Sequence, residues 1–321
     1  MVVFFGACKF ELEPRSFCQI CSGGIHVCVP NISCLDRFKI LAEVIVMNKY
    51  YLAGLIVAIV FLSCNSTNRH IISDSSDAEE HLRIYSLSEE IEKNGGVVIT
   101  VDDKGISNWY SNRKYFINKN VKCTFFITRI QDLTNDEINM LIELEGHGHE
   151  LAYHGTNHIN ADEFLRLHSL QEYFDYEISP GLSIMESKLT PPTAFAYPFG
   201  ARNDSLDEYL SNHFEILRGT AYTSAEHRIE NLEAVFVNTN ETNSLVHGVG
   251  IDSIYNNSSN DIQRGLDRAN NNGEIIIFYL HNFGGSDMYH MNFSCFDEMI
   301  HCINDLNMPI ITISQINTTL D

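Results

Sequence analysis

The stretch Gly95-Gly96-Val97-Val98-Ile99-Thr100-Val101-Asp102-Asp103 decides the fold of this chain. Its apolar part, residues 97–101, is almost continuous, which is typical of a parallel strand that is buried on both faces. Two glycines precede this strand and two aspartates follow it. The stretch therefore predicts a buried strand with carboxylates at its C-terminal end.

More apolar runs of this kind follow, and stretches with helical spacing separate most of them. The predicted strands are residues 97–101, 122–128, 150–153, 194–197, 217–222, 234–238, 274–280 and 309–314. The predicted helices are residues 107–118, 135–144, 162–189, 261–270 and 295–306. Alternation of strands and helices predicts parallel strands with right-handed crossovers, hence a barrel or an open doubly wound sheet. No glycine-rich phosphate-binding motif follows the first strand, so we predict a parallel (β/α) barrel over residues 91–321.

The composition is that of a globular protein with an acidic surface. Hydrophobic residues make up 44% of the 321 residues and charged residues 20%, with seven prolines, so wholesale disorder and a polytopic membrane protein are poor interpretations. Asp and Glu number 42 against 21 Lys and Arg, which gives a formal net charge of -21. Such a surface repels phosphate backbones and anionic lipids, so we expect no nucleic-acid partner. It does not disfavour a neutral sugar polymer.

Residues 47–64 have the layout of a bacterial lipoprotein signal peptide. A short basic start at Met47 is followed by an apolar run over residues 50–62 and by a small residue before Cys64. This layout predicts cleavage before Cys64 and lipidation of that cysteine. The alternative is an ordinary internal hydrophobic helix.

The position of the predicted signal peptide determines how the residues before and after it are interpreted. Residues 1–46 become an upstream extension that is not part of the mature protein, and the polar residues 65–90 become a flexible tether. A zinc site at Cys18 and Cys21, with His26 and Cys28, is a weaker alternative for the extension. We expect the protein at the cell envelope, either lipid-anchored at Cys64 or periplasmic, with the lipidated terminus as its only membrane contact.

Polar side chains follow four of the predicted strands. They are Asp102 and Asp103, His154 with His158 four residues later, Tyr197, and His281. In a parallel barrel these positions lie on one rim, the C-terminal face, so we expect the side chains to converge. Two imidazoles and a carboxylate suit a divalent, zinc-like ion with open positions for water and substrate, and the remaining carboxylate is a candidate base.

The order of these motifs resembles the polysaccharide deacetylases, which are carbohydrate esterase family 4 and carry the NodB homology domain. The similarity extends over roughly residues 95–315. The family's Thr-Phe-Asp-Asp-Gly motif corresponds to Thr100-Val101-Asp102-Asp103-Lys104, and its His-Ser/Thr-x-x-His motif to His154-Gly155-Thr156-Asn157-His158. Its Tyr-Pro and Leu-His motifs correspond to Tyr197-Pro198 and Leu280-His281.

The resemblance implies that the fold is a deformed parallel (β/α) barrel of about seven strands. It also implies a metal-dependent hydrolase that removes acetyl groups from an N- or O-acetylated polysaccharide. It implies Asp103, His154 and His158 as ligands of a divalent metal, expected to be Zn²⁺. Asp102 would be the general base and His281 the general acid. A backbone N–H near Tyr197 would contribute to the oxyanion site.

The chain differs from the family in the residues that orient the general base. Thr193 stands in the place of an arginine that orients the base, and the only tryptophan, Trp109, lies outside the family's Asp-x-x-Asp-Trp motif. Arg202 and Arg218 are candidate replacements. Two alternatives therefore stay open: a catalytically weakened glycan-binding protein, and a related C–N hydrolase that acts on a small amide.

Overall fold

A computed structural model describes residues 4–5, 8–9, 17–22, 25–30, 71–238, 243–285 and 288–318. The chain divides into two compact units, Met1–Ser76 and Asp77–Asp321. In the first unit, β1 (Phe4–Phe5) pairs antiparallel with β2 (Cys8–Lys9), and β3 (Phe17–Ser22) pairs antiparallel with β4 (Ile25–Pro30). The signal peptide predicted at residues 47–64, Cys64 included, lies outside the described residues and stays a prediction.

Helix α3 (Ile71–Asn94) occupies most of the segment for which the sequence predicts a flexible tether, residues 65–90. From Ile71 onward this segment is helical, which corrects that part of the prediction. Its last turns are anchored, because Ile91 is fully buried and Leu87 packs against the same apolar cluster. The two residues are four positions apart and so share one helix face, a weak signal within a polar stretch. Within the described ranges, no helix combines the length and the apolar character needed to cross a membrane.

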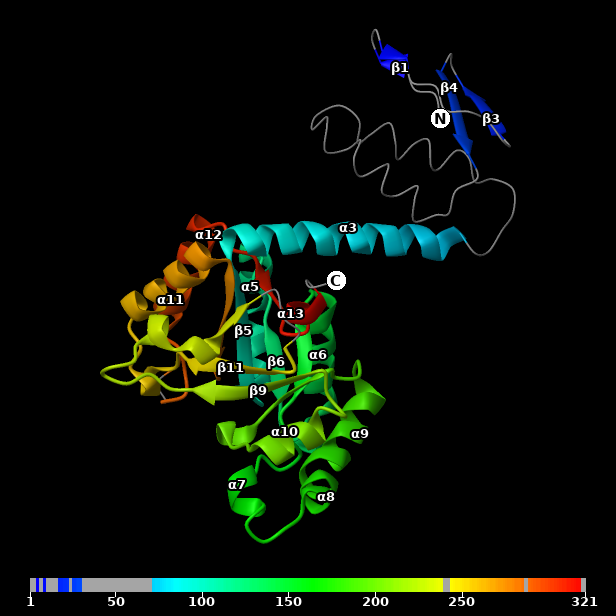
Figure 1. The fold of residues 1–321 in the computed structure, drawn as a ribbon. Coiled ribbons are helices and arrows are strands. Elements are labelled where there is room, and N and C mark those ends of the chain that lie inside the picture. Colours follow the sequence, from blue (N-terminus) through cyan, green and yellow to red (C-terminus); the bar gives the residue numbers. More distant parts are fainter. Residues whose placement is uncertain are drawn as a thin grey trace. The chain divides into compact units, whose positions relative to one another are not determined.

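Seven parallel strands of the second unit close into a barrel, as the sequence predicts (Figure 1). In ring order they are β5 (Gly96–Asp103), β6 (Thr124–Ile127), β7 (Glu150–Tyr153), β8 (Ala194–Ala196), β9 (Ile216–Ala221), β11 (Leu245–Gly250) and β12 (Glu274–Leu280). Pairing of β12 with β5 closes the ring, from Ile275 opposite Gly96 to Leu280 opposite Val101. The parallel (β/α) barrel is therefore confirmed.

The membership of the ring differs from the prediction. The sixth strand is β11, whose His247 and glycines interrupt the apolar pattern that marks the other strands. The strand predicted at residues 234–238 is β10 (Phe236–Asn238), which pairs antiparallel with the start of β12. The strand predicted at residues 309–314 shortens to β13 (Ile310–Ile311), which pairs with the start of β5. Both short strands lie at the N-terminal end of the barrel. There β13 pairs with residues of β5 that precede its pairing with β6, and β10 pairs with residues of β12 that precede its pairing with β11.

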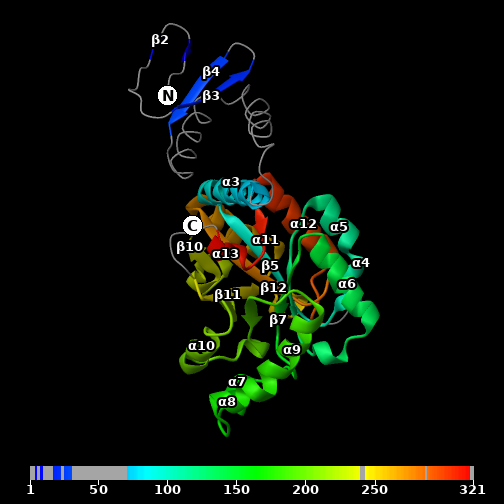
Figure 2. The ribbon, with the colours of Figure 1, turned by 90° about the vertical axis from the view of Figure 1, so that its right-hand side faces the viewer.

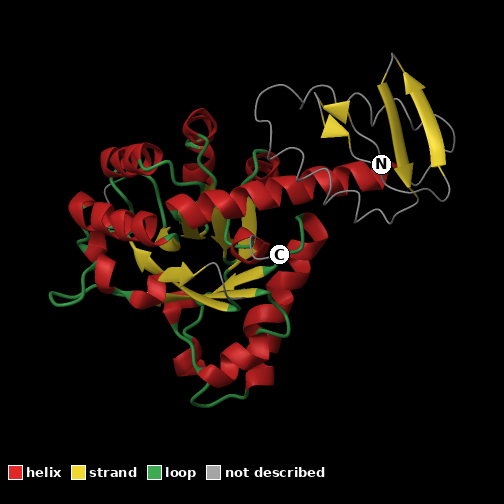
Figure 3. Cartoon of the chain, turned by 45° about the horizontal axis from the view of Figure 1, so that its top comes forward, coloured by secondary structure: helices red, strands yellow, loops and turns green. Residues whose placement is uncertain are grey.

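Helices surround the barrel, as Figure 3 shows. Their bounds are α4 (Ile106–Ser111), α5 (Arg113–Lys119), α6 (Asn135–Gly146), α7 (Ala161–Phe164), α8 (Leu170–Tyr173), α9 (Ser179–Lys188), α10 (Asp204–Leu210), α11 (Ser259–Asn272), α12 (Phe293–Asp305) and α13 (Gln315–Thr318). Single 3-10 turns are η1 (Ile130–Asp132), η3 (Pro198–Gly200), η4 (Ile229–Asn231), η5 (Glu233–Val235) and η6 (Ser253–Tyr255). The long helix predicted at residues 162–189 is divided into α7, α8, a π-helical turn η2 (Phe174–Ile178) and α9. Figures 1 and 2 place α7, α8 and α10 at the end of the barrel opposite α3.

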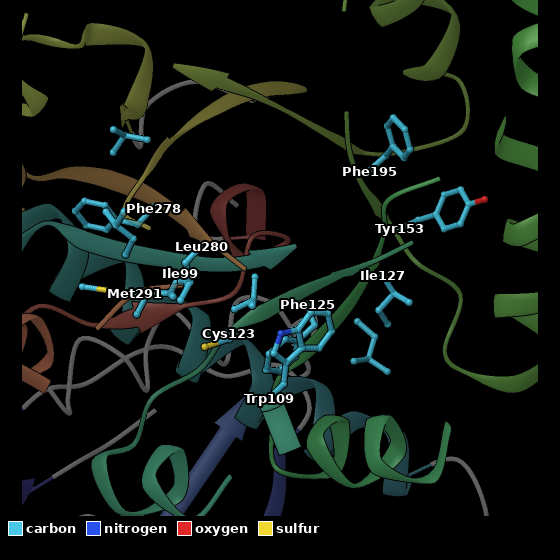
Figure 4. Packing of buried hydrophobic residues seen from close by; sticks show 14 of the residues in the cluster. Ile99, Trp109, Cys123, Phe125, Ile127, Tyr153, Phe195, Phe278, Leu280 and Met291 are labelled. Carbon is cyan, nitrogen blue, oxygen red and sulfur yellow. The ribbon is translucent and has the colours of Figure 1, made fainter. Parts of the chain in front are cut away.

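Apolar side chains pack on both sides of the barrel wall. Successive residues of a strand point to opposite faces. Along β5, Ile99 belongs to the outer cluster, in which Trp109 stacks on Phe125 with ring centres 4.9 Å apart (Figure 4), whereas Val98 belongs to the inner cluster. The same alternation turns Asp102 toward the barrel interior at the mouth.

Candidate metal centre and active site

The three predicted metal ligands meet at the C-terminal rim of the barrel. Asp103 ends β5, and His154 and His158 follow β7. One ligand atom of each residue lies within 4.8 Å of the ligand atoms of the other two. Oδ1 of Asp103 is 3.8 Å from Nε2 of His154 and 3.2 Å from Nε2 of His158. The fold therefore brings together the trio that the sequence predicts.

The protonation of His154 and of Asp103 fits a divalent cation. Nδ1 of His154 lies 2.8 Å from the carbonyl oxygen of Ala196, and because a carbonyl only accepts, Nδ1 carries the proton and Nε2 keeps its lone pair. Burial lowers the pKa of His154 to about 4, which favours the neutral ligand form. Burial alone would raise the pKa of Asp103, but a hydrogen bond to His158 and the charges of His154 and His281 hold it below its ordinary value. A neutral His154 imidazole and an ionised Asp103 carboxylate, with a ring nitrogen of His158 as the third candidate ligand atom, are a donor set for Zn²⁺ or a similar ion.

The backbone is strained at two of the ligands. Asp103 has φ 83° and His158 has φ 58°, in the left-handed region that residues with a side chain rarely adopt. Hydrogen bonds hold both segments: Thr128 N–H donates to the Asp103 carbonyl at 3.0 Å, and Arg129 N–H donates to the Gly155 carbonyl at 3.1 Å. Strain of this kind persists where the surroundings impose it, and it is concentrated at functional sites.

Asp102 lies beside the trio in the mouth of the barrel and is 3% exposed. Nη2 of Arg218, a residue of β9, donates to both carboxylate oxygens, and its distance to Oδ1 is 2.5 Å. The guanidinium is fully buried, with the ring centres of Phe126 and Tyr279 at 5.2 Å and 5.1 Å. The sequence offered Arg202 and Arg218 as candidates to orient the base. The structure gives this contact to Arg218.

Neither Arg202 nor Thr193 contacts the candidate base. Arg202 pairs with Asp207 of α10 instead of Asp102. Thr193 precedes β8, so it lies at the N-terminal end of the barrel, and its hydroxyl is 2.9 Å from the hydroxyl of Ser314. An arginine at position 193 would therefore lie at the N-terminal end of the barrel, whereas Asp102 lies at the C-terminal end.

His281 follows β12, and its Nε2 is 4.0 Å from Oδ2 of Asp103. Its Nδ1 lies 2.6 Å from Oδ2 of Asp252, whose Oδ1 accepts the backbone N–H of His281 at 3.1 Å. Burial alone would lower the pKa of His281, but the hydrogen bond to Asp252 and the charges of Asp102, Asp252 and Asp103 raise it above its ordinary value.

Sequence reasoning missed Asp252, although a signal existed. Asp252 is 1% exposed and lies just beyond β11. It is a carboxylate at the C-terminal end of a buried strand, like the other candidates on the rim. It was overlooked because β11 was not recognised as a strand.

Helix α4 fixes the segment that carries His281. The Trp109 Nε1–H donates to the His281 carbonyl at 2.8 Å. The Asn108 side chain accepts the N–H of Phe283 at 2.9 Å and donates to its carbonyl at 3.0 Å. A Cβ at Gly105 would lie 2.4 Å from Oδ1 of Asn282, so a glycine lets α4 approach this closely.

The backbone N–H of Tyr197 itself is engaged in the barrel wall, so this residue is not an oxyanion donor, and the wider prediction of a donor near Tyr197 stays a prediction. Residues of β8 alternate, so Ala196 faces the barrel interior and Tyr197 packs in the outer cluster against Phe195, with ring centres 5.2 Å apart. The Tyr197 N–H already donates to the Arg218 carbonyl at 3.0 Å. The following Pro198 has no N–H to offer. Tyr197 therefore supports the pairing of β8 with β9.

An open groove of about 610 Å³ lies next to the candidate metal centre, and it is lined by Ile159, Asn160, Glu163, Phe164, Leu167, His168 and Phe199. The ring of Phe199 is 60% exposed and meets the His158 ring edge-on, with centres 4.6 Å apart. Leu167 is 86% exposed. Apolar faces and polar groups therefore lie together beside the centre, which suits a ligand with both C–H faces and hydroxyl groups.

Residues 90–213 match the family described as polysaccharide deacetylase. The matched segment contains the trio and Asp102, and it ends before Arg218, Asp252 and His281. No curated protein matches the chain.

Solved structures with a related fold share little sequence with the chain. The Xyl-CE4 domain of a multidomain xylanase from the hindgut metagenome of Trinervitermes trinervoides is 18% identical, with a TM-score of 0.45 over 68% of this chain and 88% of that one. The peptidoglycan deacetylase PdaC from Bacillus subtilis is 16% identical, with a TM-score of 0.47 over 71% and 92%. A family 4 acetyl xylan esterase from Clostridium thermocellum, in complex with a cobalt ion, is 16% identical, with a TM-score of 0.44 over 68% and 89%.

Proposed function

Because residues 90–213 match the polysaccharide deacetylase family, we propose that this protein is a metal-dependent hydrolase that removes acetyl groups from an N- or O-acetylated polysaccharide at the cell envelope. One observation carries the proposal. The trio of Asp103, His154 and His158 converges on one rim of the barrel. Asp102 and His281 flank this trio, and each is held by a buried partner of opposite charge.

The roles of the flanking residues follow from their partners. When bound to the trio, a divalent cation supplies a Lewis acid that polarises the acetyl carbonyl and makes a water molecule more acidic. Asp102, oriented and balanced in charge by Arg218, accepts the proton of the attacking water. His281, kept protonated by Asp252, donates a proton to the leaving amine or alcohol. One residue thus takes a proton and the other returns one.

The size of the site favours a polysaccharide over a small amide. The groove beside His158 extends the site well beyond the space that an acetamide needs, and its volume falls within the roughly 300–1,000 Å³ that is usual for ligand sites. The formal net charge of -21 favours a neutral chain over an anionic one.

The structure also weakens the case for a glycan-binding protein without turnover. That alternative rested on the missing arginine at Thr193. Because Arg218 contacts both oxygens of Asp102, the candidate base is oriented from another strand.

Acetate release tests the proposed reaction. The purified protein, loaded with Zn²⁺, is assayed on acetylated chito-oligosaccharides, acetylated xylo-oligosaccharides and small acetamides. We expect release from an oligosaccharide, loss of release after chelation, and a fall in kcat/KM of roughly 10²- to 10⁴-fold in Asp102→Asn and in His281→Ala. Asp204→Asn, at an exposed position of α10, is the matched control. Metal-loaded protein that releases no acetate from any of these compounds would favour the binding protein.

The envelope location rests on residues 47–64 alone. We expect the mature chain to begin at a lipid-modified Cys64. Intact mass of the protein from the membrane fraction measures this, and a mature chain that still contains Met1 contradicts it.

A further inference from the structure

Glu177 is a buried carboxylate that the proposed reaction does not use. Its side chain is fully buried, and it lies in the π-helical turn η2. A buried carboxylate is costly unless hydrogen bonds compensate the lost water. π-Helical turns are rare in proteins, and those that occur often lie at functional sites. The buried carboxylate and the π-helical turn therefore both suggest that Glu177 has a specific role.

The carboxylate binds the segment that carries the second predicted histidine ligand. Oε2 accepts the N–H of Asn157 at 2.8 Å, and Oε1 accepts the N–H of Ile159 at 3.1 Å. These two residues flank His158 in the sequence. The carbonyl of Glu177 accepts a third N–H, from Thr156, at 2.8 Å. One residue therefore fixes the backbone on both sides of His158.

Gly155, between the two histidines, makes this contact possible. It has φ 87°, and a Cβ at this position would lie 2.2 Å from Oε1 of Glu177. Any side chain at position 155 would displace the carboxylate. The glycine that stands where the related family has Ser or Thr therefore leaves the space that Glu177 fills.

Other contacts hold η2 against the same loop. The Thr156 hydroxyl accepts the N–H of Gly181 at 2.9 Å, and the Tyr153 hydroxyl donates to the Ile178 carbonyl at 2.9 Å. The two hydroxyls are 2.8 Å apart. The Tyr153 hydroxyl also lies 3.2 Å from the Glu177 backbone carbonyl, so a polar network holds the backbone of Glu177 beside the loop, which restricts the conformation of its members.

We propose that Glu177 is a positioning residue for the metal centre: its carboxylate holds the loop over residues 155–159 so that Nε2 of His158 points at Oδ1 of Asp103. The inference rests on the metal site of the proposed function but not on turnover. The backbone of His158, at φ 58°, is outside the common conformations and needs such support.

Metal affinity tests the proposal. Glu177→Gln keeps the size of the side chain, but one of its two oxygens becomes an NH₂ group that faces a backbone N–H donor. We expect Zn²⁺ affinity, measured in competition with a chromophoric chelator, to fall by roughly 10- to 100-fold. The absorption spectrum of bound Co²⁺ should change as well, because the position of one ligand changes. Glu186→Gln, an exposed position of α9, is the control and should match the wild type.

A second variant separates positioning from folding. Gly155→Ala leaves the carboxylate in the chain but takes its space, and it also strains the backbone at φ 87°, so it should lower Zn²⁺ affinity at least as much as Glu177→Gln. The double variant should be no worse than Gly155→Ala alone, since both changes disturb the same contact. Should Glu177→Gln fail to fold, the Zn²⁺ affinity of Glu177→Asp decides, because this variant keeps the charge but withdraws the carboxylate from Asn157 and Ile159. Zn²⁺ affinity within about two-fold of the wild type in a folded variant overturns the role of Glu177. A wild type that binds no metal overturns the metal site itself.

Discussion

At the scale of the residue, the charge state of His281 depends on one buried neighbour. Asp252 is 1% exposed and hydrogen-bonds both the ring and the backbone N–H of the histidine. Because the folded pKa of His281 lies above its ordinary value, the protonated ring stabilises the fold. This stabilisation is complete below the unfolded pKa of about 6.5 and is lost as the pH rises through the folded pKa.

Replacement of Asp252 should therefore move the pH dependence of the reaction. In Asp252→Asn the strongest influence that raises the pKa of His281 is removed, while burial still lowers it. The general acid then loses its proton at a lower pH, so the alkaline limb of the kcat/KM profile for acetate release should shift to lower pH. The profile of Asp204→Asn should overlay that of the wild type. An alkaline limb that does not move in Asp252→Asn would show that His281 is not the acid, or that Asp252 does not control it.

At the scale of the element, strands β5 and β9 are joined inside the barrel mouth by the ion pair of Asp102 and Arg218. Both residues are almost wholly buried. Loss of one partner leaves an uncompensated buried charge, whereas loss of both does not. The same pair is thus relevant to folding and to catalysis, and the two effects can be separated by mutation.

Arg218→Met should lower the free energy of unfolding by about 3–5 kcal/mol, because Asp102 keeps its charge without a partner. The double variant Asp102→Asn with Arg218→Met should recover most of that loss and stay inactive. Chemical denaturation and acetate release measure the two effects. Lys104→Met, which breaks a half-exposed pair with Asp132, is the control and should cost at most about 1 kcal/mol. A double variant that is less stable than Arg218→Met would contradict this account of the pair.

At the scale of the whole molecule, the barrel closes on itself within the second unit. The first and last strands of the ring, β5 and β12, are direct neighbours. Among the described residues, the two apolar clusters extend from Leu87 to Ile316. The described core therefore includes the end of α3.

A fragment that begins at Asp77 should consequently fold as the longer chain does. We expect its Tm to agree with that of the whole chain within ~2 °C, and its Zn²⁺ affinity to be unchanged. A fragment that begins at Gly96 lacks Leu87 and Ile91 and should melt at a lower temperature, because their buried apolar surface is exposed. Differential scanning calorimetry gives both comparisons. Equal Tm values for the two fragments would show that α3 does not contribute to the core.

The sequence alone predicted the parallel barrel and the meeting of Asp103, His154 and His158 on its rim. Both follow from local information: apolar runs mark buried strands, and parallel strands place their C-terminal ends on the same side. The prediction was wrong about the sixth strand, because His247 and the glycines of β11 give a weak apolar signal.

Only the tertiary structure decided how these residues are supported. Which arginine meets Asp102, that Asp252 meets His281, and that Glu177 holds the loop around His158 all depend on contacts between elements that are distant in the chain. The outward direction of Tyr197 likewise depends on the register of β8 in the wall. A linear pattern records the type and spacing of residues, whereas the partner of a buried charge is fixed by strand register and helix packing, which arise only when the barrel closes.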